Sequence, residues 1–328
     1  MQACVYEEYG PAEVVRLAEV RAPEARADEV LVRVHATAVT TADWRFRSST
    51  FPRIFWLAGR LMIGLFRPRN PVLGMDFSGV VEAVGSSVTR FRVGDRVFGA
   101  TRPMRRGAHA EYIAIRETDA IVHKPDSLTH TQAAAVPFGA NCALAFLRDF
   151  AAVRPGQRVL VVGASGSVGV WAVQIARHLG AEVTAVCSGD NADLVRSLGA
   201  HHVIDYTQRP LMQPGEVYDL VLDTVGATSF AACRDALAEG GVYLPLESGL
   251  REMVQALLTA FGSGKRVKHA VSQNTRESLE AVVRLVETNA LRPVVDSVYP
   301  MARIADAHRR VEGRHKRGTV VVTVSDLG

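Results

Sequence analysis

A glycine-spaced segment, GASGSVG, follows four apolar residues at positions 159–162 and precedes an amphipathic stretch. Its glycines, Gly163, Gly166 and Gly169, are spaced three residues apart. A turn without side chains lets a pyrophosphate approach closely, and the first N–H groups of a following helix point at its phosphates. The strand, glycine loop, helix and second strand that such a site requires are all present in the pattern. The segment therefore predicts a dinucleotide-binding fold that begins near the middle of the chain.

The chain from residue 126 to residue 273 alternates strand and helix patterns. Strands are expected near 158–162, 182–187, 202–205, 218–223 and 242–246, with helices near 167–179, 191–198 and 228–238. Gly180, Gly199 and Gly240 follow the helical patterns, where helix C-caps usually lie. Alternation at this spacing predicts an α/β fold, a doubly wound parallel sheet with helices on both faces.

The first 125 residues have a different pattern, with short strands separated by turns. Residues 30–38 alternate apolar and other side chains, as in a half-buried strand. Near the C-terminus a helix is expected over 275–289, followed by strands near 294–300 and 318–324. Because these two strands are similar in character to the N-terminal region, we expect residues 274–328 to return to it.

Residues 51–66 form an apolar segment that needs its own interpretation. Its apolar side chains fall on one face of a helix and its arginines on another; the apolar ones are Phe51, Ile54, Phe55, Ala58, Leu61, Met62 and Leu65. The favoured interpretation is a helix packed on the body of the protein. A lid over a substrate cleft and a dimer contact come next, and docking on a membrane surface is the least favoured.

Length and charge limit the classes of protein to which the chain can belong. Its 328 residues suit two domains rather than one core, and its net charge of +4 is too small to indicate a nucleic-acid partner. The four cysteines are scattered and form no CxxC pair, which argues against a disulfide framework and a cysteine-rich zinc site. The N-terminal residues show no signal peptide, so we expect a cytoplasmic protein.

The end of the second strand of the predicted sheet bears on which nicotinamide cofactor binds. An acidic residue at that point favours NAD, because it accepts hydrogen bonds from both ribose hydroxyls and repels a 2′-phosphate. Here Cys187 and Ser188 occupy the position, and the first acid is Asp190. Ser188 can donate to a phosphate, although it can equally be a plain helix-entry residue. We therefore expect NADPH to bind in preference to NADH.

The segment over residues 156–177, GQRVLVVGASGSVGVWAVQIAR, resembles the signature of quinone oxidoreductases. Over nearly its whole length the chain resembles the zinc-independent, quinone oxidoreductase-like branch of the medium-chain dehydrogenase/reductase superfamily. Ser167 departs from the signature, because the family usually has a second consecutive glycine there. The resemblance implies a GroES-like β-barrel catalytic domain over residues 1–125, completed by 274–328, and a Rossmann domain over residues 126–273.

The same resemblance implies that the catalytic zinc site of the alcohol dehydrogenases is lost. In the stretch GMDFSGVVEAVGSSV, Met75 stands at the position of the zinc-binding histidine and Asp76 at that of the following glutamate. Thr40 corresponds to the cysteine ligand, and the third ligand falls near Phe138. A catalytic zinc needs about three nitrogen, sulfur or carboxylate ligands. Threonine, methionine and phenylalanine do not provide them in a form that zinc prefers, so we expect no bound zinc.

Several positions are implied to contact the cofactor by their match to the family. Tyr206 matches a tyrosine at the adenosine 2′-phosphate, residues 223–226 a turn beside the nicotinamide, and residues 315–318 a turn that closes on the cofactor. With the glycine loop, the expected cofactor-binding residues are Gly163, Ser165, Gly166, Ser167, Val168, Gly169, Ser188, Tyr206, Asp223, Thr224, Val225, Lys316 and Arg317. The respective alternatives for Tyr206 and the two turns are a core tyrosine, a strand-end turn and a solvated basic loop.

Without zinc to polarise a ketone, reduction of the C=C bond of an enone, enal or quinone is the favoured reaction. Hydride addition to the β-carbon places negative charge on an enolate oxygen, which hydroxyl or backbone N–H donors can stabilise. Thr40 is the expected catalytic donor. An apolar cleft for a small hydrophobic carbonyl or quinone substrate is expected to be lined by Trp44, Met75, Phe138 and Cys142.

Two other functions stay open at this point. One is a zinc-free ketone or alcohol dehydrogenase. The other is a non-catalytic NADPH-binding partner protein, or a membrane-associated one, with residues 51–66 as its docking face. In either case we expect a homodimer that binds no nucleic acid.

Overall fold

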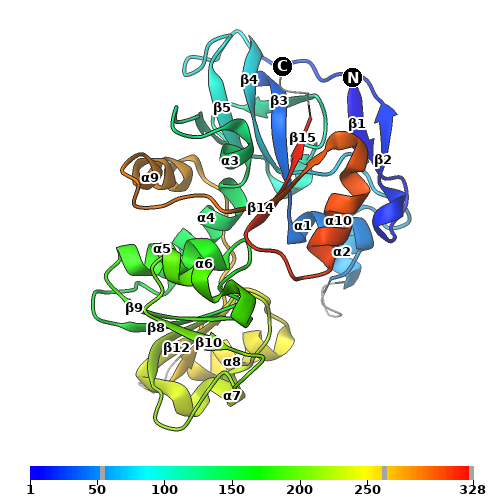
Figure 1. Ribbon diagram of the computed structural model, residues 1–328. Coiled ribbons are helices and arrows are strands. Elements are labelled where there is room, and N and C mark those ends of the chain that lie inside the picture. The colour runs from blue at the N-terminus through cyan, green and yellow to red at the C-terminus, as the bar shows by residue number, and fades with distance from the viewer. Residues whose placement is uncertain (52–55, 261–263, 325–328) are drawn as a thin grey trace. The chain divides into compact units, whose positions relative to one another are not determined.

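The computed structural model describes residues 1–51, 56–260 and 264–324, which fold into two units (Figure 1). The first unit consists of residues 1–138, 274–287 and 293 onward, and the second of residues 139–273 and 288–292. The C-terminal part of the chain returns to the first unit and adds strands to its sheet. Among the described residues, no helix is both long and apolar enough to cross a membrane.

The second unit is built on a parallel sheet of six strands in the order β10-β9-β8-β11-β12-β13. The strands are β8 (Arg158–Val162), β9 (Glu182–Cys187), β10 (His202–Asp205), β11 (Tyr218–Asp223), β12 (Leu237–Pro245) and β13 (Arg266–Val267). The helices are α5 (Gly169–His178), α6 (Ala192–Ser197), α7 (Phe230–Cys233) and α8 (Leu250–Thr259). The first four strands lie where the sequence predicts them.

The strand order places a reversal of winding between β8 and β11. The chain moves outward from β8 to β9 and β10, then returns to pair β11 with the other edge of β8. In a doubly wound sheet, ligands bind outside the carboxyl ends of the strands at such a reversal. The glycine loop follows β8 and residues 224–228 follow β11, so the fold brings both predicted turns to this point.

The first unit contains a seven-stranded sheet in the order β14-β15-β3-β4-β5-β7, with β6 also paired to β3. Its strands are β3 (Glu29–Val39), β4 (Asp76–Val84), β5 (Arg96–Ala100), β6 (Tyr112–Arg116), β7 (Ala120–His123), β14 (Val295–Pro300) and β15 (Thr319–Thr323). A separate antiparallel pair is formed by β1 (Gln2–Val5) and β2 (Arg16–Glu19). Val30, Val32 and Val34 of β3 lie in one buried cluster with Val81 of β4, which explains the alternation in the sequence.

Six helices accompany these strands. They are α1 (Thr41–Ser48), α2 (Trp56–Ile63), α3 (His130–Ala134), α4 (Pro137–Leu144), α9 (Arg276–Glu287) and α10 (Ile304–Glu312). The helix α4 begins at the end of the first unit and continues into the second. The helix α10 packs its buried residues Ile304, Ala307 and Val311 into the same apolar cluster as Met75.

Two elements of the second unit differ from the sequence prediction. The helix expected over 228–238 is only one turn of α7 and a short 3-10 turn, and β12 begins already at Leu237. Gly240 therefore lies inside a strand and not at a helix C-cap, although its φ is +75°. Leu237 pairs with Tyr218 of β11, and this sheet pairing outweighs the helical pattern of the local sequence.

The described part of residues 51–66 packs on the body of the protein, but not through the apolar face that the sequence predicts. The helix α2 begins at Trp56, and Ile54 and Phe55 lie outside the described residues. Only Gly59 and Ile63 of α2 are buried, whereas Leu61 and Met62 are exposed. The helix is nearly apolar all round, so the apolar pattern could not indicate which face packs.

Candidate active site

The glycine loop after β8 has a backbone that only glycine allows at two positions. Gly163 has a φ of +77°, and a Cβ there would lie 2.6 Å from the Val225 side chain. A Cβ on Gly169 would lie 2.1 Å from the carbonyl oxygen of Gly163. A Cβ on Gly166 would meet only that same oxygen, at 3.4 Å. Gly163 and Gly169 are thus required by the fold, whereas Gly166 leaves space open for a ligand.

The remaining residues of the loop are held by neighbouring elements of the same unit. The Ala164 N–H donates to the Val186 carbonyl of β9 at 3.0 Å. The Ser165 hydroxyl accepts from the Asn191 side chain at 3.2 Å. Ser167 and Val168 are buried, and a Cβ on Gly139 of α4 would lie 2.4 Å from the Ser167 carbonyl oxygen. The loop is therefore fixed before any ligand binds.

The turn after β11 is organised by one carboxylate. Asp223 is fully buried and accepts backbone N–H groups from Val225, Gly226, Ala227 and Thr228 at 2.8–3.3 Å. Its position at the end of a central strand gives it the role of shaping the turn. Thr224 donates its hydroxyl to the Val162 carbonyl at 2.8 Å, which fixes this turn against the end of β8.

The turn after β9 differs from the sequence expectation in which residues are accessible. Cys187 is buried, and burial together with the nearby Asp205 raises the pKa of its thiol to about 11. Ser188 is half-buried and accepts from the Asn191 side chain at 3.0 Å. Ser188 is thus the residue of this pair that can reach a ligand, and Asn191 joins it to Ser165 of the glycine loop.

Two residues after β10 lie beside this turn. Asp205 accepts from the Thr207 backbone and hydroxyl at 2.9 and 2.7 Å, and these bonds lower the pKa of its carboxyl. Tyr206 donates its backbone N–H to the Cys187 carbonyl, while its side chain is 48% exposed. The tyrosine is therefore not a core residue, and its ring is available at the end of β9.

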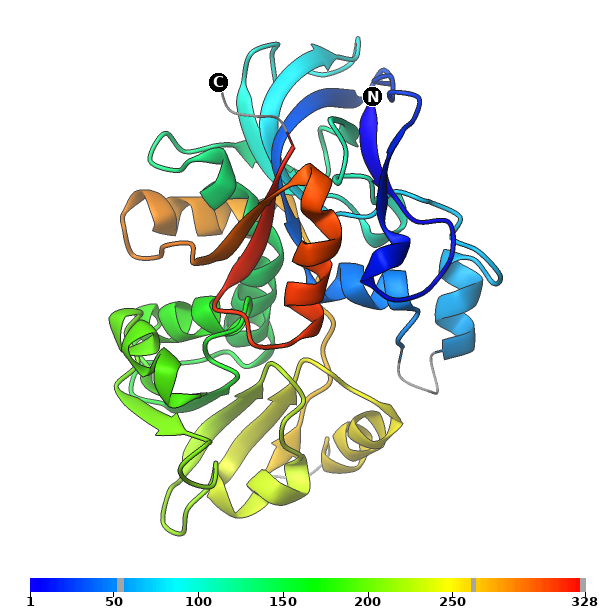
Figure 2. The ribbon, with the colours of Figure 1, turned by 45° about the vertical axis from the view of Figure 1, so that its right-hand side comes forward.

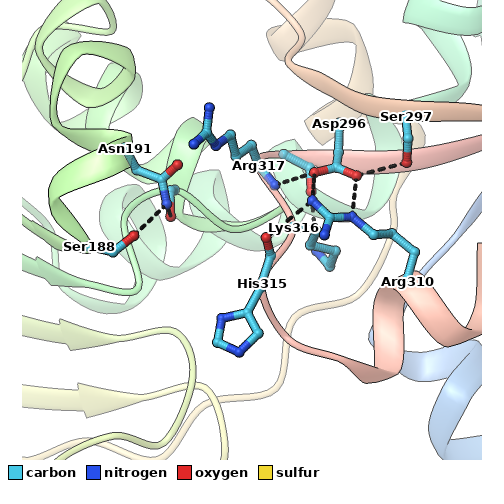
Figure 3. A network of polar contacts seen from close by, with 10 residues as sticks. Ser188, Asn191, Asp296, Ser297, Arg310, His315, Lys316 and Arg317 are labelled. Carbon is cyan, nitrogen blue, oxygen red and sulfur yellow. Dashed lines mark hydrogen bonds and ion pairs between the residues drawn. The ribbon is translucent and has the colours of Figure 1, made fainter. Parts of the chain in front are cut away.

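A buried aspartate of the first unit shapes the C-terminal basic turn, as Figure 3 shows. Asp296 of β14 accepts both nitrogens of the Arg310 fork, at 2.9 and 2.7 Å, and the Arg317 backbone N–H at 2.6 Å. Although burial raises the pKa of Asp296, these hydrogen bonds bring it below its usual value. Arg310 also donates to the His315 carbonyl at 3.2 Å. The turn is held through its backbone.

Lys316 and Arg317 lie differently in this turn. The Lys316 ammonium is buried and donates to the Gly318 carbonyl at 3.2 Å, and burial lowers its pKa to about 8. The Arg317 side chain is exposed. Of the two predicted cofactor-binding residues, only Arg317 extends into solvent, and Lys316 has a structural position.

Thr40 caps the first helix of the first unit. Its hydroxyl donates to the Asp43 carboxylate at 2.7 Å and accepts from the Asp43 backbone N–H at 3.3 Å. The other Asp43 oxygen accepts the Gly74 N–H at 3.0 Å. This is a capping box, which satisfies free N–H groups at the start of α1. A threonine hydroxyl can donate only one hydrogen bond, and Thr40 donates it to Asp43. The arrangement therefore does not favour Thr40 as a direct hydrogen-bond donor to substrate.

Asp76 is a buried acid in the same region that the sequence analysis placed only by its match to a glutamate. One of its oxygens accepts the Phe138 N–H at the start of α4, at 2.9 Å. The other has no hydrogen-bond partner among the described residues. Burial raises the pKa of Asp76 well above its ordinary value, and the bond from Phe138 opposes this only in part. Burial therefore favours the protonated form of Asp76 over a wider pH range than for an ordinary carboxyl group.

The four residues expected to line an apolar cleft are found in different surroundings. Met75 is buried, and the half-buried Trp44 packs against the same cluster. Phe138 is half-buried and tied to Asp76. Cys142 belongs to the second unit, and burial raises the pKa of its thiol to about 11. The first unit thus brings Thr40, Trp44, Met75 and Phe138 into one region, in which Met75 is a core residue.

This region does not fit a catalytic zinc ion. The thioether of Met75 and the ring of Phe138 are not zinc ligands of the usual kinds, and the Thr40 hydroxyl is bonded to Asp43. Both Asp43 oxygens accept hydrogen bonds. Within residues 1–51, 56–260 and 264–324, no three histidine, cysteine or acidic side chains come together in a way that could hold a metal.

Sequence reasoning missed the acids that shape these turns. Asp205 and Asp296 carry no motif, because each acts on backbone groups that only the fold brings near. Asp43 could have been found, since a threonine followed three residues later by an acid before a helix is a capping signal. Asp76 was placed, but its charge state depends on burial, which the local sequence does not report.

Two protein families match the chain. Residues 26–126 match the alcohol dehydrogenase GroES-like domain, and residues 198–322 match the zinc-binding dehydrogenase family. The match of residues 26–126 agrees with the seven-stranded sheet of the first unit. Together with the doubly wound sheet of the second unit, it confirms the predicted fold class.

Similar proteins match nearly the whole chain. The mitochondrial NAD(P)H oxidoreductase RTN4IP1 of Homo sapiens is 32% identical over 99% of this chain and 89% of its own. The chloroplastic NADPH-dependent alkenal/one oxidoreductase of Arabidopsis thaliana is 30% identical over 98% of this chain and 79% of its own. The structure of the quinone oxidoreductase from Coxiella burnetii has a TM-score of 0.88 at 28% identity and covers 99% of both chains.

The names of these relatives contradict one prediction from the sequence. The human relative is named as mitochondrial and the Arabidopsis relative as chloroplastic. The prediction of a cytoplasmic protein is therefore wrong. It was drawn from the composition of the N-terminal residues, which carries little information on location.

Proposed function

This chain belongs to the quinone oxidoreductase-like branch of the medium-chain dehydrogenase/reductase superfamily, and on this premise we propose that it is an NADPH-dependent reductase. One relative is named as an NAD(P)H oxidoreductase, and another as an NADPH-dependent alkenal/one oxidoreductase. We propose further that the hydride acceptor is the C=C bond of an enone, enal or quinone, and that the reaction needs no zinc. We call the surroundings of Thr40, Met75 and Phe138, the three positions of the zinc ligands, the metal region. The observation that carries the proposal is the contrast between an intact glycine loop and a metal region whose three positions hold no usual zinc ligand.

The residues of the second unit that would hold the cofactor are those at the reversal of winding. The open side of Gly166 accommodates the pyrophosphate, because no side chain occupies that space. The turn held by Asp223 presents Thr224 and Val225 beside Gly163, so their position suits the nicotinamide half. When bound, the nicotinamide supplies the hydride.

Discrimination of NADPH from NADH is assigned to the turn after β9. Ser188 offers a hydroxyl there, Tyr206 offers an exposed ring, and no carboxylate occupies the end of β9. Asp205 lies near, and one of its oxygens, Oδ1, accepts both hydrogen bonds from Thr207. A 2′-phosphate is favoured by such hydroxyl donors.

The metal region of the first unit supports a reaction on a conjugated C=C bond. Negative charge then develops on an enolate oxygen, which neutral hydrogen-bond donors can stabilise without a Lewis acid. Asp76 suits this reaction in its protonated form, which burial favours, because a carboxylate at the same place would repel the developing charge. Thr40 contributes by holding Asp43, and Asp43 in turn holds the Gly74 N–H next to Met75. We therefore assign Thr40 a positioning role.

The test follows the hydride from cofactor to product. The full chain is incubated with NADPH deuterated at the transferred position and a simple enone, and the product is analysed by mass spectrometry and NMR. We expect deuterium on the β-carbon and loss of the C=C bond. Deuterium on the carbinol carbon with the C=C bond intact would instead show a ketone reductase. Absence of NADPH oxidation with every enone, enal and quinone tried would contradict an enzymatic role of this kind.

A further inference from the structure

The helix α2 is the light-blue helix at the edge of the first unit in Figure 2. With the turn after it, this helix exposes an unusual number of apolar side chains. The exposed apolar side chains are Trp56, Leu57, Leu61, Met62, Leu65 and Phe66, and Phe66 is 87% exposed. A helix on the surface of a globular protein normally turns charged and polar residues outward. We define these six residues as the α2 surface.

The α2 surface is presented on a well-anchored segment. On the inner side of α2, Ile63 is buried in the core cluster, and a Cβ on Gly59 would lie 2.9 Å from the Phe51 ring. After the helix, the Tyr9 hydroxyl donates to the Gly64 carbonyl at 2.7 Å, and the Arg69 N–H donates to the Ile63 carbonyl at 2.8 Å. The exposed side chains are thus held outward by the fold.

The only charged residue within α2, Arg60, interacts with groups of the same unit. Its guanidinium lies 3.8 Å from the centre of the Tyr9 ring and 5.5 Å from that of Trp56, and it donates to the Leu65 carbonyl. Its charge is therefore engaged within the first unit. The exposed charges of the segment, Arg67 and Arg69, stand in the turn beside Phe66.

The charged residues next to the α2 surface along the chain have one sign. From residue 44 to residue 75 the chain contains six arginines and no aspartate, glutamate or lysine. Of these, Arg67 and Arg69 are exposed beside Phe66, whereas Arg47 is buried and paired with Glu312. Aromatic and aliphatic side chains flanked by arginines are typical of segments that lie in the interface of a lipid bilayer. Each basic residue near an anionic lipid surface strengthens binding about fivefold. We propose that the α2 surface docks on the surface of an anionic membrane, without crossing it.

A second copy of the chain fits this surface less well. A twofold contact would place the same patch on both sides, so that Arg67 and Arg69 of one copy would face those of the other. Like charges at such a contact oppose association, whereas an anionic headgroup layer complements them. The helix α8 provides a contrast, because Leu257 and Leu258 are exposed there while the helix itself contains no aromatic residue, and its one arginine, Arg251, is followed by Glu252.

The experiment measures co-sedimentation of the full chain with vesicles. One set is pure phosphatidylcholine, and the other contains about one third phosphatidylglycerol, each at low and high salt. We expect binding to the anionic vesicles at low salt, at least about fivefold weaker binding to the neutral ones, and a loss at high salt. Phe66→Asp should reduce binding about tenfold or more, because it places a charge where an aromatic ring would insert.

Leu258→Asp on α8 is the matched control, since it makes the same kind of change at an exposed leucine of the second unit. It should bind anionic vesicles like the unchanged protein. Both positions are exposed, at 87% and 76%, so neither substitution should disturb folding. Fluorescence of Trp56 gives a second reading: brominated lipid should quench it, and Trp56→Phe should remove that quenching.

Three results would overturn the proposal. The first is no binding to either kind of vesicle. The second is equal loss of binding in Phe66→Asp and Leu258→Asp, which would show that the α2 surface is not the contact. The third is self-association of the full chain that Phe66→Asp abolishes while vesicle binding stays unchanged, which would assign the surface to a second copy. None of these readings depends on NADPH oxidation, so failure here leaves the proposed reductase function untouched.

Discussion

The glycine loop of the second unit depends on its backbone, whereas the metal region of the first unit depends on the identity of its side chains. In the loop, the structure depends on what is absent: a Cβ on Gly169 would lie 2.1 Å from the Gly163 carbonyl oxygen. In the metal region, the structure depends on which side chain is present, and Met75 stands where a zinc-binding histidine is expected. A backbone-defined site tolerates almost no change, whereas a side-chain-defined site can lose its metal and keep its fold.

The same comparison explains the polar groups of the two regions. Asp223 gives its oxygens to backbone N–H groups of a turn and keeps that turn ready for a ligand. In the metal region, Asp43 likewise holds Thr40 and Gly74, but Asp76 keeps one oxygen without a partner among the described residues. Both oxygens of Asp223 are thus engaged, whereas Asp76 keeps one unpaired oxygen and burial favours its protonated form.

The largest effect is expected from a side chain in the space that we assign to the pyrophosphate. Gly166→Ala should leave the stability of the protein nearly unchanged, because the new Cβ meets only one atom at 3.4 Å. It should weaken NADPH binding about a hundredfold, since losing two hydrogen bonds to a charged phosphate has that effect. Titration calorimetry with NADPH measures the affinity, and thermal unfolding measures the stability.

Two further glycines sharpen this test. Gly169→Ala should lower the melting temperature as well as binding, because its Cβ collides with backbone. Gly264→Ala, with only a Glu239 oxygen at 3.9 Å from its Cβ, should change neither. If Gly166→Ala binds NADPH as tightly as the unchanged protein, the open side of Gly166 is not the phosphate site.

The next effect concerns the basic turn of the first unit. Asp296→Asn breaks a pair with Arg310 in which the aspartate side chain is 2% exposed and the arginine 36%. A fully buried pair loses about 3–5 kcal/mol, and the exposure of Arg310 reduces the expected loss to about 2 kcal/mol. Urea unfolding measures it. Asp306→Asn, which breaks the more exposed pairs with Arg303 and Arg309, should lose less stability than Asp296→Asn.

The contribution of Asp296 also depends on pH with a definite sign. Its folded-state pKa is lowered below the ordinary value of 3.8, so its stabilisation is present above that pH and is lost as the pH falls through the folded-state pKa. The difference in unfolding free energy between Asp296→Asn and the unchanged protein should therefore shrink in acid. An equal difference at every pH would contradict the assigned ion pair.

A smaller effect is expected in the choice of cofactor. Ser188→Asp should lower the ratio of NADPH to NADH affinity about tenfold or more, since it replaces a donor with a charge that repels a phosphate. Ser188 is the position to change, because Cys187 is buried beside Asp205. The exposed Asp190→Asn is the control and should leave the ratio unchanged. Equal NADPH and NADH affinities in the unchanged protein would remove the basis for this assignment.

The mildest prediction concerns the unpaired acid. Because burial raises the pKa of Asp76 above its usual 3.8, its protonated form favours folding at low pH and this contribution is lost as the pH rises through the folded-state pKa. Asp76→Asn keeps an acceptor for the Phe138 N–H and carries no charge. It should therefore gain stability relative to the unchanged protein as the pH rises, with no gain below about pH 4. Thermal unfolding across the pH range measures this difference. If Asp76→Asn were less stable than the unchanged protein at high pH, Asp76 would be a stabilising carboxylate and the prediction would be wrong.

The fold was more accessible to sequence reasoning than the site. Glycines that the backbone requires, such as Gly163, and the strand periods of β8 to β11 are properties of the local sequence. The helix expected over 228–238 fails because Leu237 pairs with Tyr218, a partner far away in the chain. In the same way, Thr40 was expected to donate a hydrogen bond to a substrate, but its hydroxyl donates to Asp43. Site chemistry depends on such long-range partners and on burial.

The most direct test of the account asks whether the metal region works without metal. The full chain, exhaustively treated with a chelator and shown by elemental analysis to hold no zinc, is assayed for NADPH oxidation with an enone before and after zinc is added. The account predicts unchanged turnover in both conditions, because Thr40, Met75 and Phe138 provide no zinc site. Loss of turnover on chelation, recovered in proportion to one zinc ion per chain, would contradict it.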